Sequence, residues 1–245
     1  MRRREVLSLA ALAASPTLAA TAIAPDDGVA PAGVVPSGNW VHAYAAFGEP
    51  KYPRGFDHFE YLNPNAPKGG TLYLPPSDRR TSIDKLNYYT IKGNAPAGVA
   101  LFMIESLAYL GADETQTMYG LLAQEMLVAP DKSAIVFRLH PKARFSNGDP
   151  VTSVDVKYSF DILTSPLVLP NYSTDLAGVA KAIVVDARTI RFDLRDASSD
   201  QLFKIGRMPV FSRKWGLKAD GTRPPFDQII NDDADRQRAV HDRAR

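Results

Sequence analysis

Two runs rich in β-branched residues, separated by only three residues, constrain the fold most strongly. Residues 182–185 (AIVV) and 189–194 (TIRFDL) flank the segment Asp186-Ala187-Arg188, and this pattern predicts a β-hairpin. The strands of a hairpin pair antiparallel, whereas a regular Rossmann sheet is parallel and is built from crossover units. The sequence therefore predicts an α/β fold of the mixed α+β kind.

Periodicity predicts the other elements. Apolar residues recur at helical spacing over 98–110, 153–163 and 198–208, and we also expect 117–127 to be helical. Alternation predicts a half-buried strand over 134–139 and a short strand over 70–74. Asn147-Gly148 before Pro150 predicts a sharp turn. Thr152 and Asp155 have the spacing of a reciprocal N-terminal cap for helix 153–163.

Composition excludes several classes of function. The chain has 245 residues, of which 45% are hydrophobic and 23% are charged, as in globular proteins. Its net charge of +2 leaves no basic excess for nucleic acid, so we expect no nucleic-acid partner. The absence of cysteine excludes disulfides, thiolate zinc sites and a cysteine nucleophile.

Neither end of the chain has the composition of a folded domain. Arg2-Arg3-Arg4 precedes an apolar run with small residues after it, which indicates an export signal over 1–22. The run RREVL resembles the twin-arginine motif, and the general secretory route remains the alternative. Residues 23–41 are expected to be a flexible leader. Residues 231–245 contain four Asp and four Arg and offer no apolar face, which favours a solvated polar tail, for example a terminal helix.

No motif for covalent catalysis or metal binding stands out. Ser82 and Lys85 match S-x-x-K, in which the lysine activates the serine, but the KTG triad of the penicillin-binding enzymes is absent. The four histidines lack metal-ligand spacing. Asp113-Glu114 could serve acid–base chemistry, although a cap for the helix expected at 117–127 is the favoured interpretation. We therefore predict no catalytic residue, no metal and no cofactor. An exported serine hydrolase or acyltransferase that uses Ser82 and Lys85 is the alternative.

Several separated segments carry a resemblance to one family. ARFSNGDPVTSVDVKYSF, residues 143–160, resembles the signature "RFxDGxPVTAxDVxFSF" of the family 5 extracellular solute-binding proteins, which are oligopeptide receptors of ABC importers. HAYAAFGEPKYPRGFDHFEYLNPNAPKGGTLYL, residues 42–74, is similar to the N-terminus of receptors of the microcin C importer type. The runs YGLLA (119–123), FRL (137–139) and DARTIRF (186–192) keep the family's order. The resemblance covers roughly residues 40 to 230.

The resemblance implies a fold and a function. Family members have the bilobal periplasmic binding protein fold of type 2, so residues 42–99 and 201–230 would belong to lobe one and residues 100–200 to an inserted subdomain. The protein would be periplasmic and monomeric, would not span the membrane after signal cleavage, and would deliver oligopeptides to the permease subunits of an ABC importer. The loop of Lys92, Gly93, Asn94 and Ala95 would correspond to one that offers backbone groups to the peptide, and an ordinary turn before the helix expected from residue 98 is the alternative. Main-chain hydrogen bonds would give broad specificity.

The C-terminal segment departs from the family's pattern. After residue 231 the family would continue toward a "GPY" segment and the second lobe, whereas this chain turns into the polar tail. We expect this to reflect a truncated receptor with weak or absent peptide affinity, because half a cleft cannot supply both sets of partners.

Overall fold

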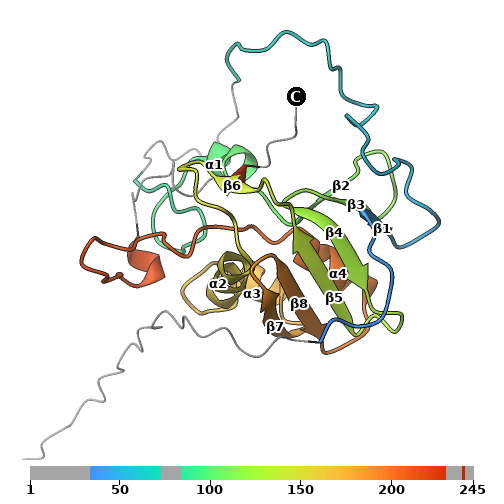
Figure 1. Ribbon diagram of the computed structural model, residues 1–245. Coiled ribbons are helices and arrows are strands. Elements are labelled where there is room, and N and C mark those ends of the chain that lie inside the picture. Colours follow the sequence, from blue (N-terminus) through green and yellow to red (C-terminus); the bar gives the residue numbers. More distant parts are fainter. Residues whose placement is uncertain (1–33, 73–83, 230–238, 241–245) are drawn as a thin grey trace, which may run out of the picture.

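The computed structural model of the chain describes residues 34–72, 84–229 and 239–240 (Figure 1). The predicted signal peptide, Ser82 and most of the predicted tail therefore lie outside the described residues. The largest sheet has four antiparallel strands in the order β4-β5-β8-β7, and a second sheet has three antiparallel strands in the order β1-β3-β2. The mixed α+β class predicted from the sequence is confirmed.

The strands of the large sheet are β4 (Ala123–Val128), β5 (Ala134–Leu139), β7 (Val179–Asp186) and β8 (Thr189–Leu194). The small sheet consists of β1 (Ala43–Ala45), β2 (Ala108–Leu110) and β3 (Thr117–Gly120), and a two-residue ladder joins β6 (Arg144–Phe145) to β9 (Ala239–Val240). The helices are α1 (Ala97–Phe102), α2 (Ser153–Leu163), α3 (Pro170–Asp175) and α4 (Ser199–Gly206), with a 3₁₀ turn at Phe226–Gln228.

The β7–β8 hairpin confirms the feature that most constrained the fold. The turn is closed by Asp186, whose Oδ1 accepts a hydrogen bond from the amide of Arg188 at 2.8 Å. The first strand runs over residues 179–186 and is longer than the predicted 182–185, because Val179, Lys181 and Asp186 also pair with β8. Strand β5 has the predicted bounds, 134–139.

Helix α2 begins at the predicted cap. The Thr152 side chain accepts from the amide of Asp155, and Asp155 Oδ2 accepts from the amide of Thr152 at 2.9 Å, so both halves of the capping box are present. The preceding turn is also confirmed, since Gly148 has a φ of +89° and its amide donates to the carbonyl of Phe145 at 2.8 Å. Helix α4 lies within the predicted span 198–208.

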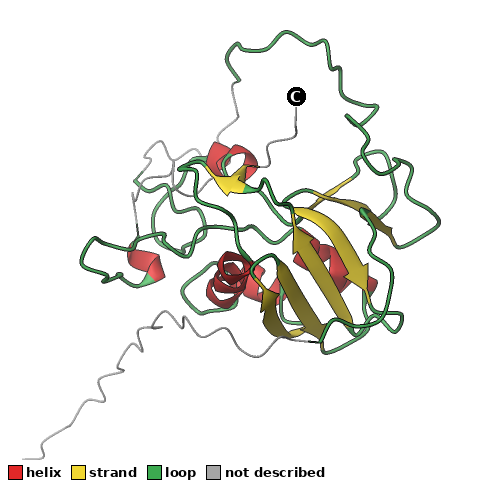
Figure 2. Cartoon of the chain, in the orientation of Figure 1, coloured by secondary structure: helices red, strands yellow, loops and turns green. Residues whose placement is uncertain are grey.

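The principal core lies between the four-stranded sheet and the helices α2 and α4 (Figure 2). Side chains from alternate positions of the central strands point into it and meet one face of each helix. The fully buried members of this core include Ile135, Phe137 and Leu139 of β5, Ile190 and Phe192 of β8, Val156 and Leu163 of α2, and Leu202 and Ile205 of α4.

The opposite face of the sheet is covered by the chain just before β1. Trp40 stacks under the guanidinium of Arg138, whose central carbon lies 3.9 Å from the ring centroid, and Arg191 Nη1 donates to the carbonyl of Val34 at 2.5 Å. Val41 exchanges two backbone hydrogen bonds with Met126 at the edge of β4. Residues 34–41 of the segment predicted as a flexible leader thus pack on the sheet. Val136, predicted to face solvent from a half-buried strand, is fully buried.

Three predicted elements differ from the structure, one of them throughout and two in part. Residues 98–110 form a helix only as far as Phe102 and then a strand, and 117–127 forms strands β3 and β4 in place of a helix. A strand that is buried on both faces has no periodicity that separates it from a helix, and β3 is such a strand: Met118 enters the principal core and Tyr119 a separate aromatic cluster. Residues 70–72 are irregular, Leu72 is exposed, and the rest of the strand expected at 70–74 lies outside the described residues.

Within the described ranges, no helix is both long enough and apolar enough to cross a membrane. Strand β3, in the predicted inserted subdomain, pairs with β1 of predicted lobe one on one side and with β2 on the other. The domain boundaries inferred from the family resemblance remain predictions.

Candidate functional site

The predicted ligand loop is a surface loop directly before α1. Lys92 and Gly93 are exposed, and Asn94 and Ala95 are half-buried. Among the hydrogen bonds of the described residues, none involves the main chain of Lys92, Gly93 or Ala95. Among the described residues, the loop therefore leaves the backbone of Lys92 and Gly93 unpaired and exposed, which is what the capture of an extended chain requires.

The loop is closed at its base by a pair of bonds between Asp84 and Asn94. The Asp84 amide donates to the Asn94 carbonyl at 3.2 Å, and the Asn94 amide donates to Asp84 Oδ1 at 2.6 Å. Gly93 has a φ of +82°, and a Cβ at this position would lie 2.5 Å from Asp84 Oδ1. Only glycine fits here, because both the left-handed backbone and the close approach of the carboxylate exclude a side chain.

Further bonds attach the loop to the core. Asn87 is fully buried; its Nδ2 donates to the carbonyl of Phe226 at 3.1 Å and its Oδ1 accepts from the amide of Tyr89. The carbonyl of Tyr89 accepts from the amide of Leu169 at 2.8 Å. Hydrogen bonds to Phe226 and Leu169, which are distant in sequence, thus hold the first part of the loop that leads to residues 92–95.

Lys85, the base in the serine-hydrolase alternative, is buried within the same loop. Its Nζ donates to the carbonyl oxygen of Thr90 at 2.6 Å and to Thr90 Oγ1 at 2.8 Å. Burial lowers the pKa of Lys85, and the nearby carboxylate of Asp84 partly opposes that change. Ser82 lies outside the described residues, so the geometry of a Ser82–Lys85 pair is not tested. The ammonium of Lys85 is engaged with Thr90.

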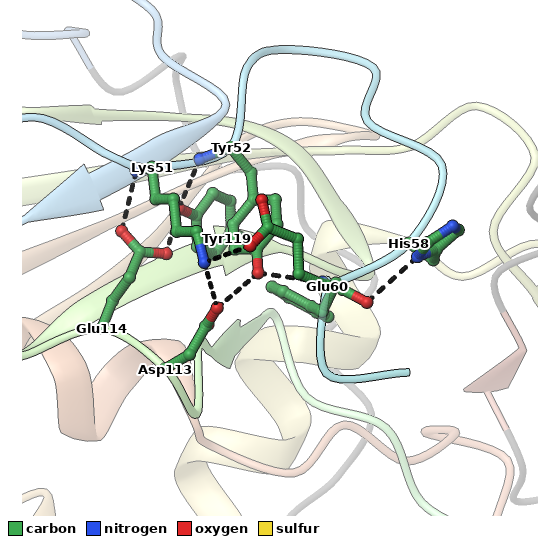
Figure 3. A network of polar contacts seen from close by, with 8 residues as sticks. Lys51, Tyr52, His58, Glu60, Asp113, Glu114 and Tyr119 are labelled. Carbon is green, nitrogen blue, oxygen red and sulfur yellow. Dashed lines mark hydrogen bonds and ion pairs between the residues drawn. The ribbon is translucent and has the colours of Figure 1, made fainter. Parts of the chain in front are cut away.

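A second polar cluster holds the loop after β1 onto the small sheet (Figure 3). Lys51 Nζ lies 2.7 Å from both Asp113 Oδ2 and Glu60 Oε2, and its amide donates to Glu114 Oε1 at 2.8 Å. The Tyr52 hydroxyl donates to Asp113 Oδ2 at 2.5 Å and accepts from the amide of Glu60 at 3.0 Å. The contacts with Asp113 and Glu114 join segments about sixty residues apart in the chain, and those with Glu60 lie within the loop.

Tyr119 connects this cluster to the sheet. Its hydroxyl accepts from the amide of Tyr52 at 3.1 Å and donates to a carboxylate oxygen of Glu114. Its ring packs edge-on against Tyr52, Phe56 and Phe59, which form the separate aromatic cluster. His58 lies at the edge of Figure 3 and contacts the carbonyl of Phe59 through Nδ1.

Both interpretations of Asp113-Glu114 from the sequence require correction. No helix follows at 117–127, so the pair caps nothing, and both carboxylates are held by Lys51, Tyr52 and Tyr119. Hydrogen bonds from Lys51 and then Tyr52 lower the pKa of Asp113. The hydrogen bonds to Asp113 and Glu60 raise the pKa of Lys51, and burial, followed by the bond to Glu114, raises that of Tyr119. A carboxylate held this firmly in its charged form is suited to tethering a loop.

Within the described residues, no group of three or more His, Asp or Glu side chains could hold a metal ion. The histidines of the described ranges have separate partners: His42 contacts the carbonyl of Tyr52 through Nε2, and His140 Nδ1 accepts from the amide of Lys142.

Comparison with known proteins identifies the family. Residues 117–235 match the model described as bacterial extracellular solute-binding proteins, family 5 Middle. Over 186 residues the chain is 34% identical to the "Probable peptide-binding protein YejA" of Agrobacterium fabrum, in an alignment that covers 76% of this chain and 29% of that protein. Over residues 117–235 this chain matches the family 5 solute-binding proteins. The resemblance found in the sequence motifs is confirmed.

Two further proteins are also similar to this chain over part of its length. Over 174 residues the chain is 30% identical to the "Uncharacterized protein YejA" of Escherichia coli, covering 71% of this chain and 28% of that protein. The solved structure of Listeria monocytogenes OppA bound to peptide overlaps 58% of this chain and 32% of that chain, with a TM-score of 0.45 and 20% identity. The chain spans less than a third of the length of these relatives. The family comprises binding proteins, as the sequence predicted, and not enzymes.

Proposed function

We propose that this family 5 chain is the substrate-binding component of an ABC importer and that its ligands are extended oligopeptides. The observation that carries the proposal is the match of residues 117–235 to the solute-binding family, together with 34% identity to a relative named as peptide-binding. The chain acts in the periplasm after export by the signal at 1–22, by the twin-arginine route, and meets the permease subunits as a monomer. Residues 42–99 and 201–230 form lobe one, and 100–200 the inserted subdomain.

The proposed mode of recognition is main-chain hydrogen bonding to the loop of Lys92, Gly93, Asn94 and Ala95, within a cleft between two lobes. Its support is the exposure of the loop and the unpaired backbone of Lys92, Gly93 and Ala95. Affinity that comes from peptide main chain tolerates many side chains, since the ligand adds to the receptor as a strand would. The aliphatic stem and charge of Lys92 would then tune the preference at one ligand position.

Calorimetric titration tests the proposal. Pentaalanine is the probe, because its side chains are too small to carry recognition. We expect it to bind weakly, in keeping with the low affinity expected from the sequence, and we expect an analogue with three N-methylated central amides to bind at least about tenfold more weakly still, since each lost hydrogen bond contributes roughly 0.5–1.5 kcal/mol. Equal affinity for the two peptides would contradict main-chain recognition. Binding of neither peptide would contradict the assignment of oligopeptides as the ligand of this chain.

A further inference from the structure

Lys85 is the only lysine in the described part of the chain whose side chain is buried; 5% of the residue is exposed. A buried ammonium destabilises a fold unless hydrogen bonds replace its lost hydration. Two of its three donors bind Thr90, one to the carbonyl oxygen and one to Oγ1. This contact ties together two positions on the first limb of the ligand loop.

The second limb of the loop rests on the stem of the same side chain. A Cβ placed on Gly93 would lie 3.2 Å from Lys85 Cδ, so the backbone of Gly93 sits directly against the aliphatic part of Lys85. The preceding residue, Asp84, holds the amide of Asn94. Lys85 therefore contacts both limbs, the first through its ammonium and the second through its methylene groups.

We infer that Lys85 is a positioning residue that fixes the shape of the loop over residues 84–95, so that the main chain of Lys92 and Gly93 stays open to a ligand. The inference rests on the proposed function for its consequence in binding, but the tether itself is a property of the unliganded chain. Lys85 touches no ligand and acts through Thr90 and Gly93. The assignment replaces the role of catalytic base that S-x-x-K suggested.

Two pairs of variants isolate the tether. Lys85→Met keeps the stem and removes the ammonium, and Lys181→Met removes an exposed lysine from β7 as the control for lost charge. Thr90→Val removes Oγ1 at nearly constant volume, and Thr90→Ser retains it. The readouts, on the full chain, are amide hydrogen exchange at Asp84 and Asn94, which close the loop base, and at Val136 in the central sheet.

We expect Lys85→Met to accelerate exchange at Asp84 and Asn94 at least about tenfold while leaving Val136 unchanged, since a hydrogen bond to a charged group is lost from a local unit. Thr90→Val should do the same to a smaller extent, and Thr90→Ser and Lys181→Met should not. Pentaalanine affinity should fall in the same order. Unchanged exchange at the loop base in Lys85→Met would overturn the inference.

If Lys85→Met accelerates exchange everywhere or does not fold, the Thr90 pair decides: equal loop exchange in Thr90→Val and Thr90→Ser overturns the tether. Failure of the proposed function can be told apart from failure of the tether. In the first case the unsubstituted chain does not bind pentaalanine, but the variants still show the exchange pattern expected of the tether. Faster loop exchange with unchanged pentaalanine affinity would contradict the inferred role in binding.

Discussion

Replacing Asp155 with alanine should destabilise the protein strongly, because one buried carboxylate serves two parts of the fold. Asp155 Oδ2 accepts from the amide and hydroxyl of Thr152 at the start of α2, and Oδ1 accepts from the amide of Arg213 at 2.9 Å. Only 4% of Asp155 is exposed. Loss of an N-terminal cap costs about 0.5–2 kcal/mol, and a buried donor left unpaired costs about 1–3 kcal/mol. We therefore expect a loss of roughly 2–4 kcal/mol in the free energy of unfolding.

The matched control lies on the same helix. Asp161 pairs with Lys157 at 2.6 Å one turn away, but both side chains are about 40% exposed, so Asp161→Ala should change the free energy of unfolding by less than about 0.5 kcal/mol. Urea denaturation followed by circular dichroism measures both variants. If Asp155→Ala costs no more than Asp161→Ala, the claim that the carboxylate joins α2 to the segment at 213 is wrong.

Two other predictions concern the loops. Gly93→Ala should weaken pentaalanine binding and accelerate exchange at Asn94, because the new methyl group displaces Asp84 and an alanine at positive φ costs about 1–2 kcal/mol; unchanged affinity and exchange would contradict the loop geometry. The lowered pKa of Asp113 means that its contribution to stability is present above about pH 4, the ordinary range of an aspartate, and is lost as pH falls through its folded-state value. Asp113→Asn should flatten that acid limb in urea denaturation, and an identical pH dependence would refute the role given to Lys51.

The sequence predicts correctly those elements that are specified by residues only a few positions apart. The hairpin at 179–194, strand 134–139 and the cap of α2 were readable because turn residues, alternation and the Thr152–Asp155 spacing each act within a few positions. Strands β3 and β4 were not, because consecutive residues such as Met118 and Tyr119, or Met126 and Leu127, are both buried, and because the two strands are shaped by pairing with β1 and β5. Long-range pairing overrode the local helical pattern.

In the candidate site, too, the sequence indicated features within a few positions and missed contacts between distant positions. The family resemblance pointed to residues 92–95, and the motif search singled out Lys85, Asp113 and Glu114. The structure gives Asp113 and Glu114 a different role from the predicted cap, whereas the pairing of Lys85 with Ser82 stays untested. Thr90 binds Lys85 and Asn94 binds Asp84, and each pair lies within ten residues of sequence. The S-x-x-K motif, however, does not indicate that the ammonium of Lys85 is buried. The contacts of Lys51 and Tyr52 with Asp113 span about sixty residues, and no spacing rule predicts them.

Amide hydrogen exchange of the chain with and without saturating pentaalanine tests most directly whether an extended peptide binds the main chain of the ligand loop. We predict slower exchange at Lys92, Gly93 and Ala95, whose backbones are unpaired in the described structure, and no change at Glu60 in the loop held by Tyr52. Peptide binding that leaves the exchange at residues 92–95 unaltered would contradict the account.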